Sequence, residues 1–198
     1  MGKRVLTCDE DYRTEAIDAI AAFDERVHAA ETIKAWNVPT PCEGWATGDL
    51  VAHVSGSVRM FVTVAGLQVS EQRRQGVDGE LNPAEVIQEW EGIRAVAEEY
   101  LRTCGEPRLI RVPLGEREMT IAFAIEALVR DVVIHTWDLG HATGGDEVLP
   151  THLVTAATAS LTRLPQRIRE RGLYSNAVDP ALNASDQERL LALAGRRR

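Results

Sequence analysis

The sequence predicts an all-α protein built as a four-helix bundle. Four long stretches repeat apolar residues at three- and four-residue spacing, the period of a helix with one buried face. Prolines, glycines and short polar segments separate these stretches. The chain has 198 residues, 44% of them hydrophobic and 26% charged, which is enough to bury a sizeable core. Because it contains no internal repeat or low-complexity linker, we expect one domain over residues 1–198.

Two of the helices are expected in the first third of the chain. Residues 9–33 place apolar side chains on one face and Asp and Glu on the other. Residues 36–45 contain two prolines and a glycine, so they must leave the helix and form a structured loop. A second helix then begins with Thr47 as its expected N-cap, and Asp49 in its first turn suits the helix dipole.

The third helix has a clear start signal. Asn82 is a good N-cap, Pro83 suits the first helical position, and the apolar repeat continues until about Gly105. The pattern then changes, and the short apolar segment within residues 107–119 suggests a strand or a hairpin.

The fourth long helix is expected over about residues 120–142, ending at the pair Gly144-Gly145. Pro150 opens a further helix, and a short terminal helix is expected near residues 186–194. These last two helices form an extra C-terminal segment attached to the four-helix bundle.

Composition and charge exclude several classes of protein. The formal net charge of -8 argues against a nucleic-acid partner, and the basic ending at residues 196–198 is expected to be a solvated terminus. No apolar run is long enough to span a bilayer, and the first residues lack the apolar segment of a signal peptide. The three cysteines are widely spaced without a CxxC pair, which favours reduced thiols. We therefore expect a soluble cytoplasmic protein.

One group of residues could carry chemistry. Asp131 and His135 are four apart in the expected long helix, so they lie on the same face. A carboxylate and an imidazole at this spacing form half of a divalent metal site, which one ligand from another helix would complete. His53, set among apolar neighbours in the second helix, is the best candidate. Two plainer interpretations stay open: His53 as a hydrogen-bonded core histidine, and Asp131 as an ordinary ion-pair partner.

Two separated segments resemble the signatures of a known family. Residues 38–45 (VPTPCEGW) with 49–53 (DLVAH), and residues 130–139 (RDVVIHTWDL) with 142–144 (ATG), are similar to those of the mycothiol-dependent maleylpyruvate isomerase family, within the DinB-like metal-binding superfamily. Residues 186–196 also resemble the usual ending of the family. The resemblance implies an up-down-down-up four-helix bundle that holds a divalent metal in its core.

The resemblance also assigns the metal ligands. By position, the two histidine ligands of the family fall on His53 and His135, and the acidic ligand falls on Asp131. Family members commonly have Glu at the acidic position, and the shorter aspartate places the metal closer to its helix or binds it more weakly. Zinc is the metal that the resemblance favours, with nickel, iron or manganese as alternatives.

The implied activity is metal-dependent chemistry on a low-molecular-weight thiol. The family uses a thiol of the mycothiol type, which adds to a small-molecule electrophile in an isomerisation or an S-transfer. Two alternatives remain: a metal-dependent hydrolase or isomerase without a thiol cofactor, and a non-catalytic binding module stabilised by the metal. The sequence also leaves open a homodimer.

Several residues near these motifs have roles that the sequence leaves undecided. Asp138 follows His135 by three positions, where it could orient the imidazole or bond to the preceding loop. Arg59 and Arg130 could hold an acidic substrate or serve as ion-pair partners. Cys42 precedes the site-bearing helix, but no base is paired with it in the sequence, so a buried apolar role is favoured over that of a nucleophile.

Overall fold

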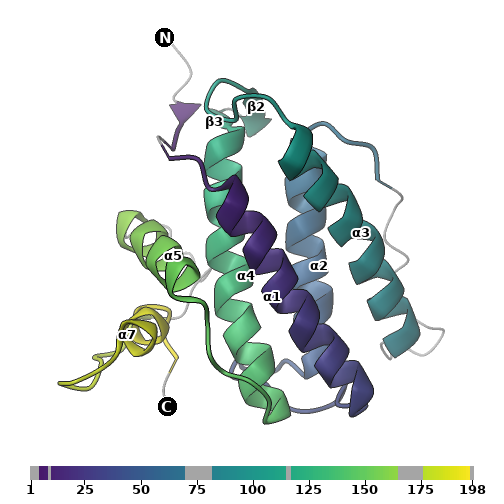
Figure 1. The fold of residues 1–198 in the computed structure, drawn as a ribbon, viewed down its shortest axis with the longest axis vertical. Helices are drawn as coiled ribbons and strands as arrows, with labels where there is room; N and C mark the ends of the chain where they lie inside the picture. The colour runs from purple at the N-terminus through teal and green to yellow at the C-terminus, as the bar shows by residue number, and fades with distance from the viewer. Residues whose placement is uncertain (1–4, 9, 70–81, 115–116, 165–175, 197–198) are drawn as a thin grey trace.

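The computed structural model describes residues 5–8, 10–69, 82–114, 117–164 and 176–196. Four long helices dominate this part of the chain: α1 (Arg13–Thr32), α2 (Thr47–Val64), α3 (Pro83–Thr103) and α4 (Ile121–Thr143). They form the bundle in Figure 1, where α1 packs against α3 and α4, and α2 packs against the same two helices. The all-α prediction is therefore confirmed.

The direction of the helices gives the bundle its topology. The chain descends through α1, ascends through α2 and α3, and descends again through α4 (Figure 1). Helices α2 and α3 are consequently parallel to each other and antiparallel to α1 and α4. This is the up-down-down-up arrangement that the resemblance implies.

The ends of the helices follow the local signals of the sequence, with one exception. The Asn82 side chain accepts a hydrogen bond from the Ala84 amide at 3.1 Å, so the predicted N-cap of α3 is confirmed. The prediction for Thr47 is wrong, because Ala46 is the N-cap of α2. The Thr47 hydroxyl instead donates to the carbonyl of Ala35, and this bond ties the start of α2 to the residues that directly follow α1.

A small sheet covers one end of the bundle. Strands β2 (Arg111–Leu114) and β3 (Arg117–Thr120) form an antiparallel hairpin, which confirms the hairpin expected within residues 107–119. Strand β1 (Val5–Leu6), which was not predicted, pairs in parallel with β3. The strand order is β1-β3-β2, and β3 leads directly into α4 through the N-cap Thr120.

In the described part of the chain, two shorter helices follow α4 (Figure 1). Helix α5 (Thr151–Arg163) packs against α4, and α7 (Asp186–Leu193) packs against α5. Ser185 caps α7 through a capping box with Glu188. The expected extra C-terminal helical segment is therefore present, and it brings the end of the chain back to the bundle.

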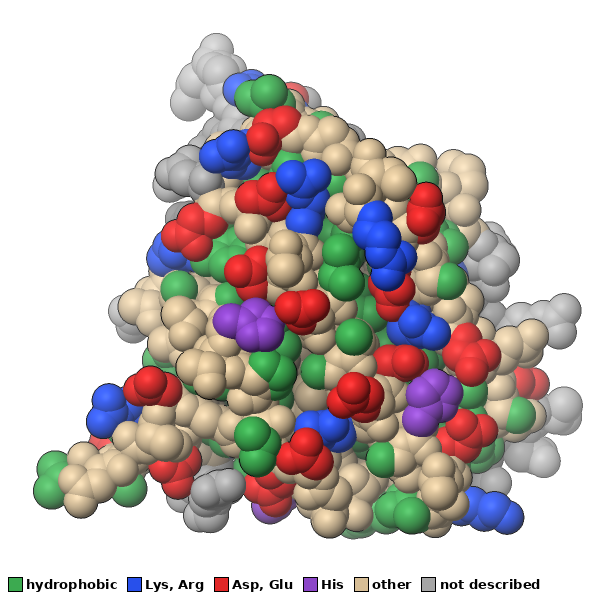
Figure 2. All heavy atoms as spheres, in the orientation of Figure 1, with side chains coloured by type: hydrophobic (Ala, Val, Ile, Leu, Met, Phe, Trp, Pro, Cys, Tyr) green, Lys and Arg blue, Asp and Glu red, His purple; other side chains and the backbone are tan. Residues whose placement is uncertain are grey.

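The interior and the surface match this architecture. The largest fully buried side chains come from α1 to α5 and include Trp90, Trp137 and Phe23. Figure 2 shows one face of the molecule, where Asp and Glu side chains are spread among separate Lys and Arg side chains. Among the described helices, none combines the length and the apolar character needed to cross a bilayer.

Candidate metal centre

The contact between α2 and α4 brings the three predicted ligands together. His53 Nε2 on α2 lies 3.7 Å from Asp131 Oδ2 on α4, and His135 Nε2 lies 3.6 Å from Asp131 Oδ1. One nitrogen or oxygen atom from each of these side chains lies within 4.8 Å of the other two. Exposure falls from 37% for the His53 side chain to 20% for Asp131 and 9% for His135, so the group opens to solvent on the His53 side.

The second ring nitrogen of His135 is held by a buried carboxylate. His135 Nδ1 lies 2.9 Å from Asp138 Oδ2, and the Asp138 side chain is completely buried. Because a carboxylate only accepts hydrogen bonds, Nδ1 carries a proton, and in the neutral form of the ring Nε2 then has a free lone pair. That lone pair faces Asp131, which is the orientation a histidine ligand needs.

Asp131 is distinguished by a carboxylate oxygen that accepts no hydrogen bond among the described residues. Its Oδ2 atom is buried and has no hydrogen-bond partner among the described residues. A buried carboxylate oxygen without a partner is costly, which requires an explanation such as a bound ion. Burial raises the pKa of Asp131, but the nearby His53 and His135 outweigh this effect and hold the pKa below its ordinary value.

The spacing of the three side chains fits a divalent ion. Ligand atoms at about 2.0–2.1 Å from a tetrahedral zinc are about 3.3 Å apart. The two histidine nitrogens lie 3.7 and 3.6 Å from different oxygens of Asp131, and one ligand atom from each of the three side chains lies within 4.8 Å of the others, so the side chains must move inward to hold an ion. Two imidazoles and one carboxylate are also a donor set that zinc accepts, with a coordination position left open.

An aromatic side chain closes one side of the group. The Trp45 ring lies 4.6 Å from the His53 ring and 6.1 Å from the His135 ring, measured between ring centroids. The loop before α2 carries Trp45, and the hydrogen bond from the Gly48 amide to the Trp36 carbonyl helps to fix this loop. Trp45 therefore covers one side of the two imidazoles.

Comparison with known proteins identifies the family of the chain. Residues 15–140 match the family model of the mycothiol maleylpyruvate isomerase N-terminal domain, which is more than half of the chain. The chain belongs to this family. An uncharacterized protein of Mycobacterium tuberculosis, found in strains CDC 1551 / Oshkosh and H37Rv, is 28% identical over 150 residues, or 75% of each chain. No solved structure matches the chain.

The family match contains all three residues of the candidate centre, but the structure adds a side chain from beyond it. Arg196 donates from Nε to Asp138 Oδ1 at 3.1 Å and from a terminal nitrogen to Asp138 Oδ2 at 2.6 Å. Its side chain is only 9% exposed. The expectation of a solvated terminus is therefore wrong for Arg196, because the buried charge of Asp138 attracts the guanidinium into the bundle.

Cys42 completes a second cluster with His135 and Asp138. Its Sγ atom lies 3.5 Å from Asp138 Oδ2 and 3.9 Å from His135 Nδ1. These three side chains could in principle hold an ion. However, an Arg196 nitrogen lies 3.4 Å from the sulfur and already neutralises Asp138, so a cation would meet a positive charge there. Asp138 thus fulfils both of its expected roles, since it bonds to His135 and to the preceding loop.

The remaining candidate residues lie outside the centre. Arg59 pairs with Glu89 at 3.0 Å, and Arg130 donates to the hydroxyl of Ser160. Neither contact is to the three residues of the candidate centre. The other histidines are surface residues with side chains 44–51% exposed, namely His28, His141 and His152.

We expect the Cys42 thiol of this family member to be inert. Burial, followed by the charge of Asp138, raises its pKa to about 12 from an ordinary 9.0. At pH 8 the folded protein then holds about a thousandfold less thiolate at this position than the unfolded chain, so alkylation slows accordingly. Peptide mapping after iodoacetamide treatment, with and without denaturant, measures the difference. Rapid labelling of Cys42 in the folded protein would contradict it.

The same shift has a consequence for stability. Because the folded pKa lies above the unfolded value, the thiol contributes its full stability below about pH 9 and loses it as the pH rises toward 12. Cys42→Ala, compared with the unchanged protein over this range, isolates that contribution.

Proposed function

We propose that the protein is a divalent-metal-dependent enzyme that activates a low-molecular-weight thiol of the mycothiol type. The thiol would add to a small electrophile, either transiently in an isomerisation or permanently in an S-transfer. The observation that carries this proposal is the buried Oδ2 of Asp131, which accepts no hydrogen bond among the described residues and lies beside His53 and His135 in a family named for a mycothiol-dependent isomerase.

Each residue has a distinct part in the proposed site. His53, Asp131 and His135 would hold the metal, and Asp138 keeps the His135 proton on Nδ1, away from the ligand side. When bound, a divalent ion supplies Lewis acidity, which favours the thiolate form of a coordinating thiol at neutral pH.

The surroundings support a co-substrate thiol over a thiol of the protein. Cys42 lies behind His135, on its Nδ1 side, and its raised pKa keeps it protonated. The nucleophile must therefore come from outside. The more exposed His53 side gives it a path to the open coordination position, and Trp45 limits the water that enters with it.

Metal analysis of the purified protein tests the first half of the proposal. We expect about one divalent ion per chain by elemental mass spectrometry, and zinc is expected, with nickel, iron or manganese as the alternatives. His53→Ala and His135→Ala should lose the ion, while His152→Ala, which removes an exposed histidine paired with Asp18, should retain it. Stoichiometric metal in both of the first two variants would refute the assignment.

Thiol kinetics test the second half. The metal-loaded protein, its chelator-treated form and His135→Ala are incubated with mycothiol and a generic electrophile, and loss of free thiol is followed. A rate above background in the metal-loaded protein alone supports the proposal. If metal binds but no thiol reaction occurs, a metal-dependent hydrolase or isomerase without a thiol, or a metal-stabilised binding module, replaces it.

A further inference from the structure

The last described residue of the chain lies against the candidate centre, far from the helices that carry the ligands in sequence. Arg196 follows α7, and α7 is fastened to the bundle by Gln187. The side-chain amide of Gln187 donates to the Glu147 carbonyl at 2.8 Å, and its oxygen accepts from the Leu149 amide at 2.9 Å. The end of the chain is therefore held in place independently of Arg196.

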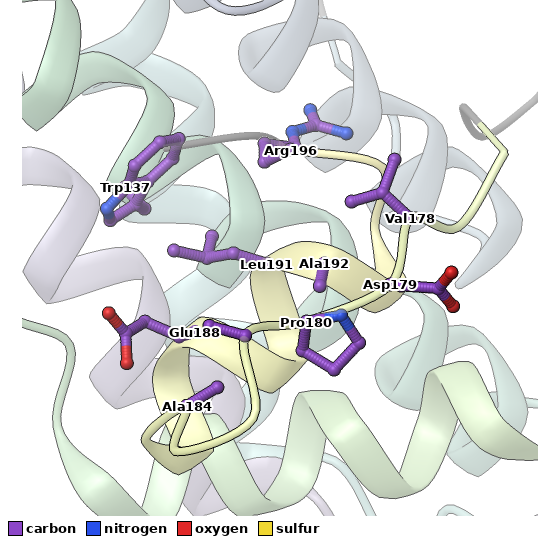
Figure 3. A pocket seen from close by; sticks show the side chains of 10 residues that line it. Trp137, Val178, Asp179, Pro180, Ala184, Glu188, Leu191, Ala192 and Arg196 are labelled. Atoms are coloured by element: carbon purple, nitrogen blue, oxygen red, sulfur yellow. The ribbon is translucent and has the colours of Figure 1, made fainter.

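A cavity of about 430 Å³ lies between α7, residues 178–184 before it, and Trp137 of α4. Figure 3 shows Trp137 and Arg196 on one side of this cavity and Pro180 and Ala184 on the other. Arg196 is among the residues that line the cavity, and its guanidinium group contacts Asp138 and Cys42. It reaches the buried carboxylate from three residues beyond the end of α7.

The contact between Arg196 and Asp138 restricts the orientation of the Asp138 carboxylate. Two separate nitrogens of the guanidinium bond to the two carboxylate oxygens, so the carboxylate plane cannot rotate freely. The oxygen that accepts at 2.6 Å from Arg196 is the same one that accepts from His135 Nδ1. Arg196 therefore sets where this oxygen lies, and the oxygen sets the orientation and the tautomer of the His135 ring.

We propose that Arg196 is a positioning residue for the metal centre, acting on His135 through Asp138. The effect of Arg196 on metal affinity rests on the function proposed above. Its effect on the orientation and tautomer of the His135 ring does not. It follows that the matched family region, residues 15–140, carries the ligands but not everything that orients them. The C-terminal segment completes the site.

The first test needs no metal. Two-bond proton–nitrogen NMR of the histidine rings, recorded on the metal-free protein near pH 7.5 and assigned with His135→Gln, reports which nitrogen carries the proton. We expect His135 to be protonated on Nδ1 alone in the unchanged protein and to show a mixture of tautomers in Arg196→Ala. An unchanged His135 pattern in that variant would overturn the proposal, whether or not the protein binds metal.

The second test measures zinc affinity by competition with a chromophoric chelator. We expect Arg196→Ala to bind zinc about 10- to 100-fold more weakly and Arg196→Lys, which keeps the charge but not the two-point contact, to fall between the two. The matched control is Arg189→Ala, which removes a 57% exposed arginine from α7 and should leave affinity unchanged.

These outcomes separate the two proposals. If the unchanged protein does not bind zinc, the proposed function is wrong. The tautomer measurement then still tests the role of Arg196. Normal binding with equal affinity in Arg196→Ala defeats the positioning role alone. Circular dichroism of each variant establishes that the helices are intact, and Arg196→Lys provides the comparison if Arg196→Ala does not fold.

Discussion

Replacing Asp138 by asparagine is expected to destabilise the metal-free protein by about 3 kcal/mol. The Asp138 side chain is fully buried and faces the guanidinium of Arg196, itself only 9% exposed. Asparagine keeps the shape but removes the negative charge, so a buried positive charge is left without compensation. It also weakens the acceptor for the protons of His135 and Cys42.

Denaturant unfolding in the presence of a chelator measures this effect without any contribution from metal. Asp179→Asn is a suitable control, because Asp179 is exposed and lies in the same C-terminal region. Combining Asp138→Asn with Arg196→Met should restore part of the lost stability, since the buried charge then disappears. A double variant as unstable as the sum of the two single ones would show that the pair is not coupled.

Gly140→Ala is expected to cost about 3 kcal/mol or more through a clash with the backbone. A Cβ atom at Gly140 would lie 2.2 Å from the carbonyl oxygen of Asp146. That oxygen cannot simply move away, because it accepts a hydrogen bond from Arg26 Nε at 2.8 Å, and this arginine is almost buried. The extra methyl group must therefore displace the loop between α4 and α5.

Gly92→Ala is the matched control for this effect. Gly92 lies inside α3, and a Cβ atom there meets nothing within 4 Å. Alanine should stabilise this helix by about 0.5–1 kcal/mol, because it restricts the unfolded chain without strain in the folded one. Thermal unfolding of the two variants should thus shift in opposite directions, and equal shifts would contradict the close approach at Gly140.

The elements that could be predicted from the sequence are those defined by local signals. The start of α3 depends on Asn82 and Pro83, which act within one turn, and the spacing of Asp131 and His135 follows from the period of α4. His53 is different, because α2 and α4 meet only through packing. Its apolar neighbours made His53 a candidate ligand, and the family resemblance placed it in one site with Asp131 and His135.

The features that the sequence did not reveal depend on contacts between distant segments. Strand β1 pairs with β3, more than one hundred residues later, and nothing in two residues indicates such a partner. Arg196 stands in a basic run of the kind that is usually solvated, and only the buried Asp138 explains its inward position. The Thr47 side chain could cap a helix, but its hydroxyl donates a hydrogen bond to the nearby carbonyl of Ala35 instead.

The parallel arrangement of α2 and α3 also bears on how the chain reaches its folded state. Helix α1 packs against α3 and α4 and not chiefly against its chain neighbour α2. Its apolar face is therefore buried by segments that are synthesised much later. Contacts between residues so far apart in sequence raise the contact order, and folding is slower than in a bundle of simple hairpins. During synthesis on the ribosome, α1 therefore lacks its most extensive contact until α4 has emerged.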